Sequence, residues 1–214
     1  MMVIYTPALI TSMTMLALGV NGLEHAGPLS IPSPSLAAAF CVIHFAKRCL
    51  EVMFLHVYSG RTDRGTPTQI GVLYALYAMC IAYSAGRDGH DYDFTTNKNM
   101  IAAGTLLFTT GIVGNFYHHY LLARLRAVPS TDSKKKYVAP RGGLFCYVAA
   151  PHYLFELVGW LGIAIAAHHL NVYLLFAVML SYLSGRSVAQ NDFNRRKFEE
   201  EWPAQRKNLI PFVF

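Results

Sequence analysis

The stretch MIAAGTLLFTTGIVGNFYHHYLLARLR, residues 100–126, decides the fold class of this chain. With its flanks, the apolar run 101–113 approaches the ~20 residues that cross the hydrocarbon core of a membrane. Behind this run Asn115, His119 and Arg126 stand at i, i+4 and i+11, which places them on one helix face. Polar groups inside a bilayer usually face a protein interior or a water-filled cavity. The stretch therefore predicts a membrane helix with one polar face.

Two further apolar stretches carry a polar stripe at helical spacing. The stripe of segment 36–57 stands at i, i+3, i+4 and i+7 and consists of His44, Lys47, Arg48 and Glu51. The stripe of segment 144–167 stands at i and i+4 and consists of His152 and Glu156. Three helices with one polar stripe each indicate one polar site enclosed by a bundle, which is typical of an enzyme or a transporter.

The composition predicts a polytopic membrane protein that forms a single domain over residues 1–214. Hydrophobic residues make up 54% of the chain, charged residues only 14%, and the mean hydropathy is +0.32. Soluble domains carry about 25% charged residues. We expect an all-α bundle of six transmembrane helices around a polar cavity open to the cytosol. The expected membrane segments are 3–20, 36–58, 68–85, 100–122, 144–168 and 171–185.

The net charge of +6 is distributed unevenly. Basic residues gather in loops 59–65 and 123–143 and after residue 185, whereas loops 21–35 and 86–99 contain only two. The positive-inside rule then places both termini and the basic loops in the cytosol. The tail 186–214 is expected to be basic and amphipathic, and to lie on the membrane surface. Nucleic-acid binding is excluded as a function, because the basic residues follow the membrane borders.

A metal centre is not expected. The pairs at 118–119 and 168–169 do not form the HxxxH or HxxHH spacing that a di-iron site of membrane desaturases uses. The acidic residues and His90 of loop 86–98 fit a solvated loop better than a metal site, because no partner ligand occurs on that side.

The polar stripes suggest specific chemistry, and each also has a simpler interpretation. Asn115 can bind a carboxamide or a hydroxyl, and Arg126 suits a phosphate. The alternative is an interfacial helix end with aromatic and basic anchors. Tyr153 can donate a proton or bind an enolate, and its alternative is an interfacial anchor. Glu156 can serve as a buried acid, and its alternative is pairing with a cation such as Arg48.

The residues in these stripes resemble the steroid 5α-reductase family of membrane enzymes, in its C-terminal reductase region of about residues 36–214. Five segments carry the resemblance: HFAKRCLEVMFLHVYSG (44–60), GNFYHHYLLARLR (114–126), YVAPRGGLF (137–145), PHYLFELVGW (151–160) and KFEEEWPAQRKNLIPFVF (197–214). The first segment also resembles the trans-2-enoyl-CoA reductase branch, and the whole chain is most similar to plant-type members. The family has seven membrane helices, so we expect that this chain lacks the first.

The resemblance implies an oxidoreductase of the endoplasmic reticulum membrane that acts on a CH–CH group with NADP as acceptor. Such an enzyme uses NADPH to reduce a carbon–carbon double bond conjugated to a carbonyl. By motif, the residues that would bind the cofactor are Asn115, His119, Arg126, Tyr137, His152 and Arg186. The expected catalytic residues are Tyr153, as proton donor, and Glu156, which matches a glutamate of the family's cofactor site. The expected partners are a lipid substrate, the membrane, and other enzymes of a lipid-elongation or steroid pathway.

Some positions differ from the steroid-reducing pattern. Tyr5 stands where those members place a glutamate that polarises the steroid ketone, and Phe45 replaces their partnering tyrosine. The expected substrate is therefore a fatty enoyl thioester or another lipid enone, besides a 3-oxo-Δ4-steroid. We expect the substrate to meet Tyr5, His44, Phe45 and Glu51. Gln190 and Asn194 also differ from the residues usual in the family.

Two alternatives to the reductase fit the same sequence. One is a membrane methyltransferase of the isoprenylcysteine type, which would bind S-adenosylmethionine. The other is a non-catalytic membrane relative that retained the fold. The segment YVAPRGGLF and the ending LIPFVF favour the reductase over the methyltransferase.

Overall fold

The computed structural model describes residues 2–20, 36–55, 65–87, 98–127 and 138–214. Within these ranges the chain forms six α-helices and two short 3₁₀ helices, and no strand. In order they are α1 (Met2–Val20), α2 (Leu36–Phe54), α3 (Gly65–Arg87), α4 (Lys98–Ala127), η1 (Gly143–Cys146), α5 (Pro151–Ala167), α6 (Leu170–Phe198) and η2 (Glu199–Glu201). The predicted all-α class is confirmed for this part of the chain.

Two of these helices, α4 and α6, are long and apolar enough to cross a membrane by length and composition. The apolar stretches of α1 and α5 are shorter. Many large apolar side chains of the two long helices point outward, among them Leu106, Val113, Leu170 and Val178, each more than half exposed. Contiguous exposed apolar surface of this kind marks contact with lipid or with a partner. The chain is therefore a membrane protein, while the number of its membrane-spanning helices remains a prediction.

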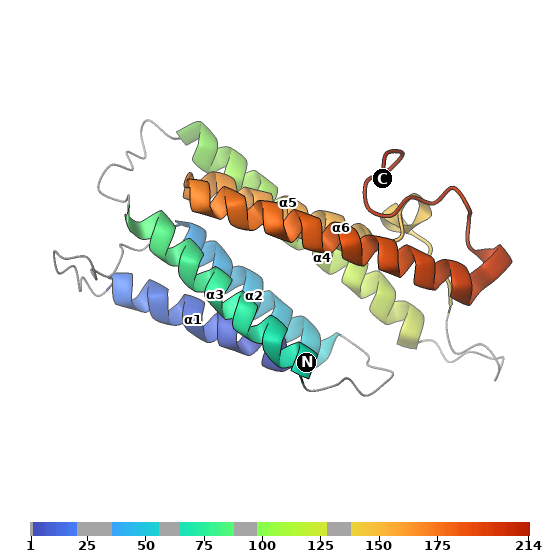
Figure 1. Ribbon diagram of the computed structural model, residues 1–214, viewed down its shortest axis with the longest axis horizontal. Helices are drawn as coiled ribbons and strands as arrows, with labels where there is room; N and C mark the ends of the chain where they lie inside the picture. Colours follow the sequence, from blue (N-terminus) through green and yellow to red (C-terminus); the bar gives the residue numbers. More distant parts are fainter. Residues whose placement is uncertain (1, 21–35, 56–64, 88–97, 128–137) are drawn as a thin grey trace.

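Successive helices run in alternating directions, so the start of α1 and the end of α6 face the same end of the bundle (Figure 1). Helices α1, α2 and α3 pack on one another in one half of the molecule. Helices α4, α5 and α6 form the other half, where α5 packs against both α4 and α6. Contacts of α2 with α5 and of α3 with α6 join the halves. The polar stripes of α2, α4 and α5 thus lie near the junction.

Glycines bring α4 and α5 into close contact. A Cβ atom placed on Gly111 would lie 2.3 Å from the backbone nitrogen of Gly159, and one on Gly162 would lie 2.4 Å from that of Phe108. Small residues at a helix crossing allow two backbones to approach, as is common between membrane helices. Close packing of α4 on α5 fixes the relative positions of their two polar stripes.

Two boundaries differ clearly from the predicted segments, and the tail after them folds back on the molecule. Pro151 begins α5, so residues 144–150 lie outside this helix, in η1 and the connection after it. Helix α6 continues to Phe198, well past the predicted end at residue 185, and its polar part buries Ser187, Asn191 and Asn194, which stand at i, i+4 and i+7 on one face. Beyond η2 the tail turns back along the start of α5, where Ala149 donates to the carbonyl of Lys207 at 2.8 Å. Leu209 is completely buried there.

Candidate functional site

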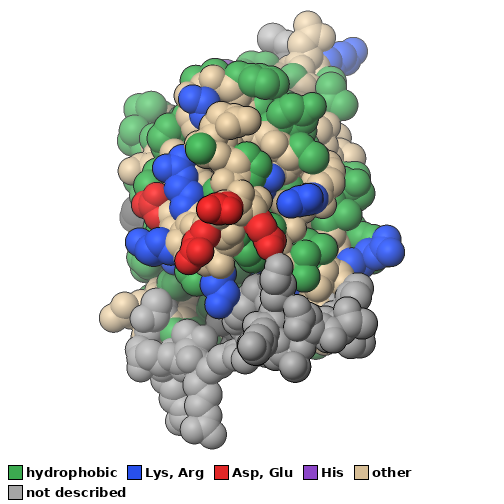
Figure 2. All heavy atoms as spheres, turned by 90° about the vertical axis from the view of Figure 1, so that its right-hand side faces the viewer, with side chains coloured by type: hydrophobic (Ala, Val, Ile, Leu, Met, Phe, Trp, Pro, Cys, Tyr) green, Lys and Arg blue, Asp and Glu red, His purple; other side chains and the backbone are tan. Residues whose placement is uncertain are grey.

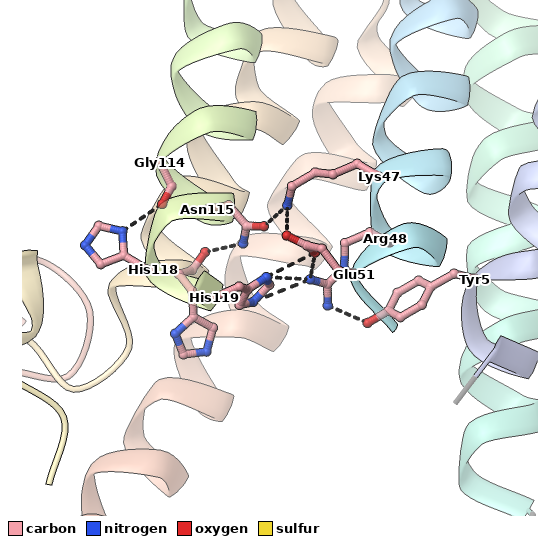
Figure 3. Close-up of polar contacts among 9 residues, drawn as sticks. Tyr5, Lys47, Arg48, Glu51, Gly114, Asn115, His118 and His119 are labelled. Carbon is pink, nitrogen blue, oxygen red and sulfur yellow. Dashed lines mark hydrogen bonds and ion pairs between the residues drawn. The ribbon is translucent and has the colours of Figure 1, made fainter. Parts of the chain in front are cut away.

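A buried guanidinium joins three helices at the centre of the site (Figure 3). Arg48 of α2 donates from Nη2 to the hydroxyl of Tyr5 on α1 at 2.6 Å. Its Nη1 donates to Oε2 of Glu51 at 2.8 Å and lies 3.0 Å from Nδ1 of His119 on α4. Arginine can only donate, so the Tyr5 oxygen accepts and its own proton can reach a further acceptor.

Lys47, the neighbour of Arg48 on α2, connects the cluster to α4 and, through Asn115, to α5. Lys47 donates to the amide oxygen of Asn115 and forms an ion pair of 2.8 Å with Oε1 of Glu51. The Asn115 amide nitrogen donates to the backbone carbonyl of His152 at 2.8 Å. Asn115 is thereby oriented from both sides, and its side chain links the polar stripes of the three helices.

A cavity of about 220 Å³ adjoins the cluster. It lies between the C-terminal part of α4, the segment before α5, the start of α5 and the polar end of α6. Its lining consists of His119, Leu122, Ala123, Arg126, Pro140, Phe145, Ala149, His152, Gln190 and Asn194. Two of these residues, His119 and His152, belong both to the cavity wall and to the cluster, and their rings are 5.3 Å apart. The polar cluster and the cavity are therefore continuous.

The structure brings most of the predicted site residues together. Asn115, His119, Glu51 and Tyr5 lie in the cluster, and His152 and Arg126 line the cavity. His44 and Phe45 instead pack in the aromatic core, where the His44 ring lies 4.9 Å from the ring of Trp160. Tyr137 lies outside the described residues. The roles assigned to all of these residues remain predictions.

The predicted catalytic residues lie next to the cluster. Tyr153 is half-buried, and its ring lies 4.2 Å from that of His152. Arg186 on α6 lies close enough to Tyr153 for an electrostatic interaction between the two side chains. Glu156 is buried and close enough to Arg48 and Lys47 for its carboxylate to interact with both cations. The ion pairs of Lys47 and Arg48 among the described residues are made with Glu51, so a direct pairing of Glu156 with a cation stays a prediction.

Several lining residues were missed as site residues in the sequence. Gln190 and Asn194 face the cavity from α6, and Gln190 Nε2 donates to Oδ1 of Asn194 at 3.0 Å. Their spacing of four residues and their departure from the family pattern were visible, but the helix was expected to end before them. Pro140 and Phe145 carry no polar signal, although the glycine pair between them indicates a constrained turn.

The chain terminus supports the wall of the cavity. Arg206 donates from Nη1 to the carbonyl of Pro140 at 3.2 Å, and its guanidinium lies 3.9 Å from the centre of the Trp202 ring. Asn191 accepts from the Trp202 indole and donates to the Arg206 carbonyl. Burial lowers the pKa of Arg206 from its usual value. The wall and the tail form one folded unit.

The end of the molecule that carries the cavity is rich in basic residues. Figure 2 shows Lys and Arg side chains around a smaller acidic group on this face. The exposed cations of the described chain near this end are Arg124, Arg126, Arg141, Arg186, Arg195, Arg196, Lys197 and Lys207. A positive field at the entrance of a site attracts anionic ligands.

Comparison with known sequences identifies the family. The profile described as 3-oxo-5-alpha-steroid 4-dehydrogenase matches residues 67–214. The chain belongs to the 3-oxo-5-alpha-steroid 4-dehydrogenase family. This family is the steroid 5α-reductase family that the sequence motifs resemble.

Individual relatives come from two branches. Human 3-oxo-5-alpha-steroid 4-dehydrogenase 1 is 31% identical over 190 residues, which cover 86% of this chain and 69% of the relative. The tomato steroid 5-alpha-reductase DET2 is 27% identical, over 81% of this chain and 66% of the relative. A very-long-chain enoyl-CoA reductase of Dictyostelium discoideum is 28% identical, over 80% of this chain and 55% of the relative. The predicted resemblance to both branches is confirmed.

Proposed function

We propose that the chain is an NADPH-dependent reductase that reduces a carbon–carbon double bond conjugated to a carbonyl in a lipid substrate. The observation that carries the proposal is the continuity between a buried polar cluster on α2, α4 and α5 and a cavity lined by Arg126. Family membership supports the reaction class, because the relatives are named as steroid and enoyl-CoA reductases. We place the enzyme in the endoplasmic reticulum membrane, with its site towards the cytosol.

The donors around the cavity fit one end of a dinucleotide. Arg126 offers a guanidinium for a phosphate, while Gln190 and Asn194 offer amides for a carboxamide or a ribose hydroxyl. Ligand pockets commonly occupy roughly 300–1,000 Å³. At about 220 Å³ the cavity has room for part of NADPH, and the rest would lie along the basic face. In this proposal Asn115, His119, Arg126, Tyr137, His152 and Arg186 hold the cofactor.

The chemistry requires a hydride, a proton and stabilisation of an enolate. When bound by the residues named above, NADPH would supply the hydride for the β-carbon of the substrate. Tyr153 donates the proton to the α-carbon, so that a second C–H bond forms and the carbon–carbon double bond becomes a single bond. The nearby guanidinium of Arg186 would stabilise the negative charge on the Tyr153 oxygen after the proton leaves. Glu156 balances the charge of Arg48 and Lys47 beside the reacting groups.

The substrate side favours an enoyl thioester or another lipid enone over a steroid. Tyr5 accepts a hydrogen bond from Arg48 and can donate its own proton to a carbonyl oxygen. A neutral phenol at this position replaces the carboxyl group of the steroid-reducing members. Phe45 is completely buried against the Trp160 ring and has no polar group to offer. The pair therefore leaves Tyr5 as the donor to a substrate carbonyl, with only an apolar ring at Phe45.

NADPH consumption by the purified chain tests this proposal. The assay compares a 3-oxo-Δ4-steroid, a long-chain trans-2-enoyl-CoA and a polyprenal as substrates. We expect substrate-dependent oxidation of NADPH, fastest with one of the two open-chain substrates. NADPH binding without turnover on any of the three would support the non-catalytic relative. Binding of S-adenosylmethionine in place of NADPH would support the methyltransferase.

A further inference from the structure

We propose that His118 is a positioning residue that fixes the turn 140–145 as one wall of the cavity. Arg206 holds the same turn from the opposite end. The sequence gives His118 no function beyond its place in a histidine pair, and the cluster around Arg48 does not include it. The effect on cofactor affinity rests on the proposed function, whereas the effect on the turn itself does not.

The side chain of His118 bridges α4 to the turn. Its Nδ1 lies 2.7 Å from the carbonyl oxygen of Gly114, and the backbone N–H of Leu144 donates to its Nε2 at 3.2 Å. The ring is stacked on Phe155 with centroids 5.1 Å apart, and it meets the edge of Phe145 at 5.5 Å. Only 3% of His118 is exposed, so the imidazole itself is largely shielded from water.

These two partners require a single tautomer of His118. A carbonyl oxygen can only accept, so Nδ1 carries the hydrogen and donates to Gly114. An N–H group can only donate, so Nε2 is unprotonated and accepts from Leu144. The neutral imidazole therefore satisfies both its own nitrogens and the first amide after the glycine pair. A phenyl ring could keep the stacking but neither hydrogen bond.

The glycine pair allows the turn to approach the ring. Gly142 and Gly143 have φ angles of +101° and +53°, in the region that favours glycine. A Cβ atom on Gly143 would lie 2.9 Å from Nε2 of His118. The backbone therefore reaches its position next to His118 only with glycine at residue 143. The glycine conformation of the turn therefore makes room for the imidazole of His118, which in return accepts a hydrogen bond from the turn.

The other end of the turn is held by the tail. Pro140 is buried, and its carbonyl accepts the hydrogen bond from Arg206 at 3.2 Å. Arg206 itself is held on the Trp202 ring. Pro140 and Phe145, at the two ends of the turn, both line the cavity. Release of either end would move a wall of the cavity without removing a group from the polar cluster.

Three variants test the role of His118 in the purified chain. His118→Phe keeps an aromatic ring and removes both hydrogen bonds, whereas His118→Gln keeps one donor and one acceptor. Tyr120→Phe is the control, because Tyr120 is 41% exposed on the same helix and lies outside the cavity lining. Hydrogen–deuterium exchange of peptides that cover residues 141–150 reports the turn directly and needs neither cofactor nor turnover.

In His118→Phe we expect these amides to exchange about tenfold faster, as for the loss of a hydrogen bond, with exchange elsewhere in α4 unchanged. His118→Gln should return exchange towards the wild-type rate. Unchanged exchange in His118→Phe would overturn the proposal. Equal effects of Phe and Gln would also overturn it, because the role would then belong to the shape of the imidazole and not to its hydrogen bonds.

Steady-state kinetics then connect the turn to the ligand. A positioning role predicts that His118→Phe raises the KM for NADPH at least threefold while kcat at saturating NADPH is retained. A large fall in kcat at unchanged KM would contradict this role. If no variant, nor the wild type, consumes NADPH, the proposed function fails. The exchange result would still decide whether His118 fixes the turn.

Discussion

Arg48 shows how a buried charge is accommodated at the level of single residues. It contacts Tyr5, Glu51 and His119, and both Arg48 and Lys47 form ion pairs with Glu51. The Glu51 carboxylate thus compensates two cations, and the buried Glu156 adds a second negative charge that acts on both. Removing one member of a buried pair typically costs about 3–5 kcal/mol, because it leaves the partner charge uncompensated. Such a cluster holds the side chains beside the cavity in fixed orientations.

The first prediction concerns the proton donor. Tyr153→Phe keeps the ring and its contact with His152 but removes the hydroxyl. If Tyr153 is the acid, turnover should fall about 10²-fold or more, as for a lost acid catalyst, while the dissociation constant of NADPH changes little. Stopped-flow or steady-state turnover, together with NADPH binding by fluorescence, measures both quantities.

Tyr147→Phe serves as the control for this experiment. Tyr147 is 49% exposed and its ring packs on Phe212, away from the polar cluster. We expect this variant to retain turnover. Retained turnover in Tyr153→Phe as well would assign Tyr153 to packing, and Tyr5 would become the next candidate for the donor.

The second prediction concerns the phosphate contact. Arg126 lines the cavity from the C-terminal turn of α4, whereas Arg124 lies on the same turn over the ring of Tyr120. Arg126→Ala should raise the dissociation constant of NADPH at least tenfold, because a charged hydrogen bond contributes about 1.5–3 kcal/mol. Arg124→Ala should leave it nearly unchanged. Similar effects of both substitutions would indicate general attraction by the basic face and would remove Arg126 from the site.

At the scale of the elements, the contact of α4 with α5 is the most sensitive part of the fold. Gly111 has no room for a Cβ atom, which would lie 2.3 Å from the backbone of Gly159. The Cβ position of Gly159 is different, since its nearest neighbours there are 3.8 Å away or more. The two glycines face each other, yet the structure predicts opposite tolerance to alanine.

The third prediction follows from this asymmetry. Gly111→Ala should destabilise the chain by about 1–3 kcal/mol, as for overpacking, and lower the Tm by several degrees. Gly159→Ala should be neutral or stabilising, because alanine is favoured over glycine in a helix by about 1 kcal/mol. Thermal unfolding in one detergent measures both. Equal Tm values for the two variants would show that the helices separate easily at this point.

The apolar runs of the sequence predicted the positions of the helices well. They did not predict where a helix continues into polar sequence. The starts and ends of α3 and α4 were predicted within a few residues, since hydropathy reports them directly. The extension of α6 to Phe198 was missed because its last turns are polar and only their spacing is helical. The docking of Leu209 beside α5 could not be predicted, because it depends on pairing between backbone groups of distant segments.

The same limit applies to the site. Helical spacing predicted that Asn115, His119 and Arg126 share a face, and the structure confirms that Asn115 and His119 meet the stripe of α2. Spacing within a helix says nothing about which helix lies opposite, so the contact between Lys47 and Asn115 could not be predicted. His44 was expected in the site because it shares the polar stripe of α2 with Arg48. The stripe, however, extends further along the helix than the site does. The turn that His44 occupies faces Trp160.

For the whole molecule, alternating helices place the start of α1 and the end of α6 at the same end of the bundle (Figure 1). The cavity and the exposed cations lie at that end as well. This agrees with the distribution of lysine and arginine among the loops, from which we predict that this end faces the cytosol.

Glycosylation mapping is the fourth prediction and tests the orientation. An acceptor sequence inserted within residues 86–99 should be glycosylated in microsomes, and one inserted within residues 130–136 should not. The two insertions serve as controls for each other, because both loops connect consecutive apolar segments. The reverse pattern would place the cavity on the lumenal side and contradict a site supplied with cytosolic NADPH.

Transfer of deuterium from the cofactor tests the central claim most directly. NADPH labelled with deuterium at the reactive position of the nicotinamide is incubated with the purified chain and a long-chain trans-2-enoyl-CoA, and the product is analysed by mass spectrometry. The proposed function predicts a saturated acyl-CoA with one deuterium at the β-carbon, at a rate that falls in Tyr153→Phe. A saturated product without deuterium, or no saturated product from this or any steroid enone or polyprenal, would contradict it.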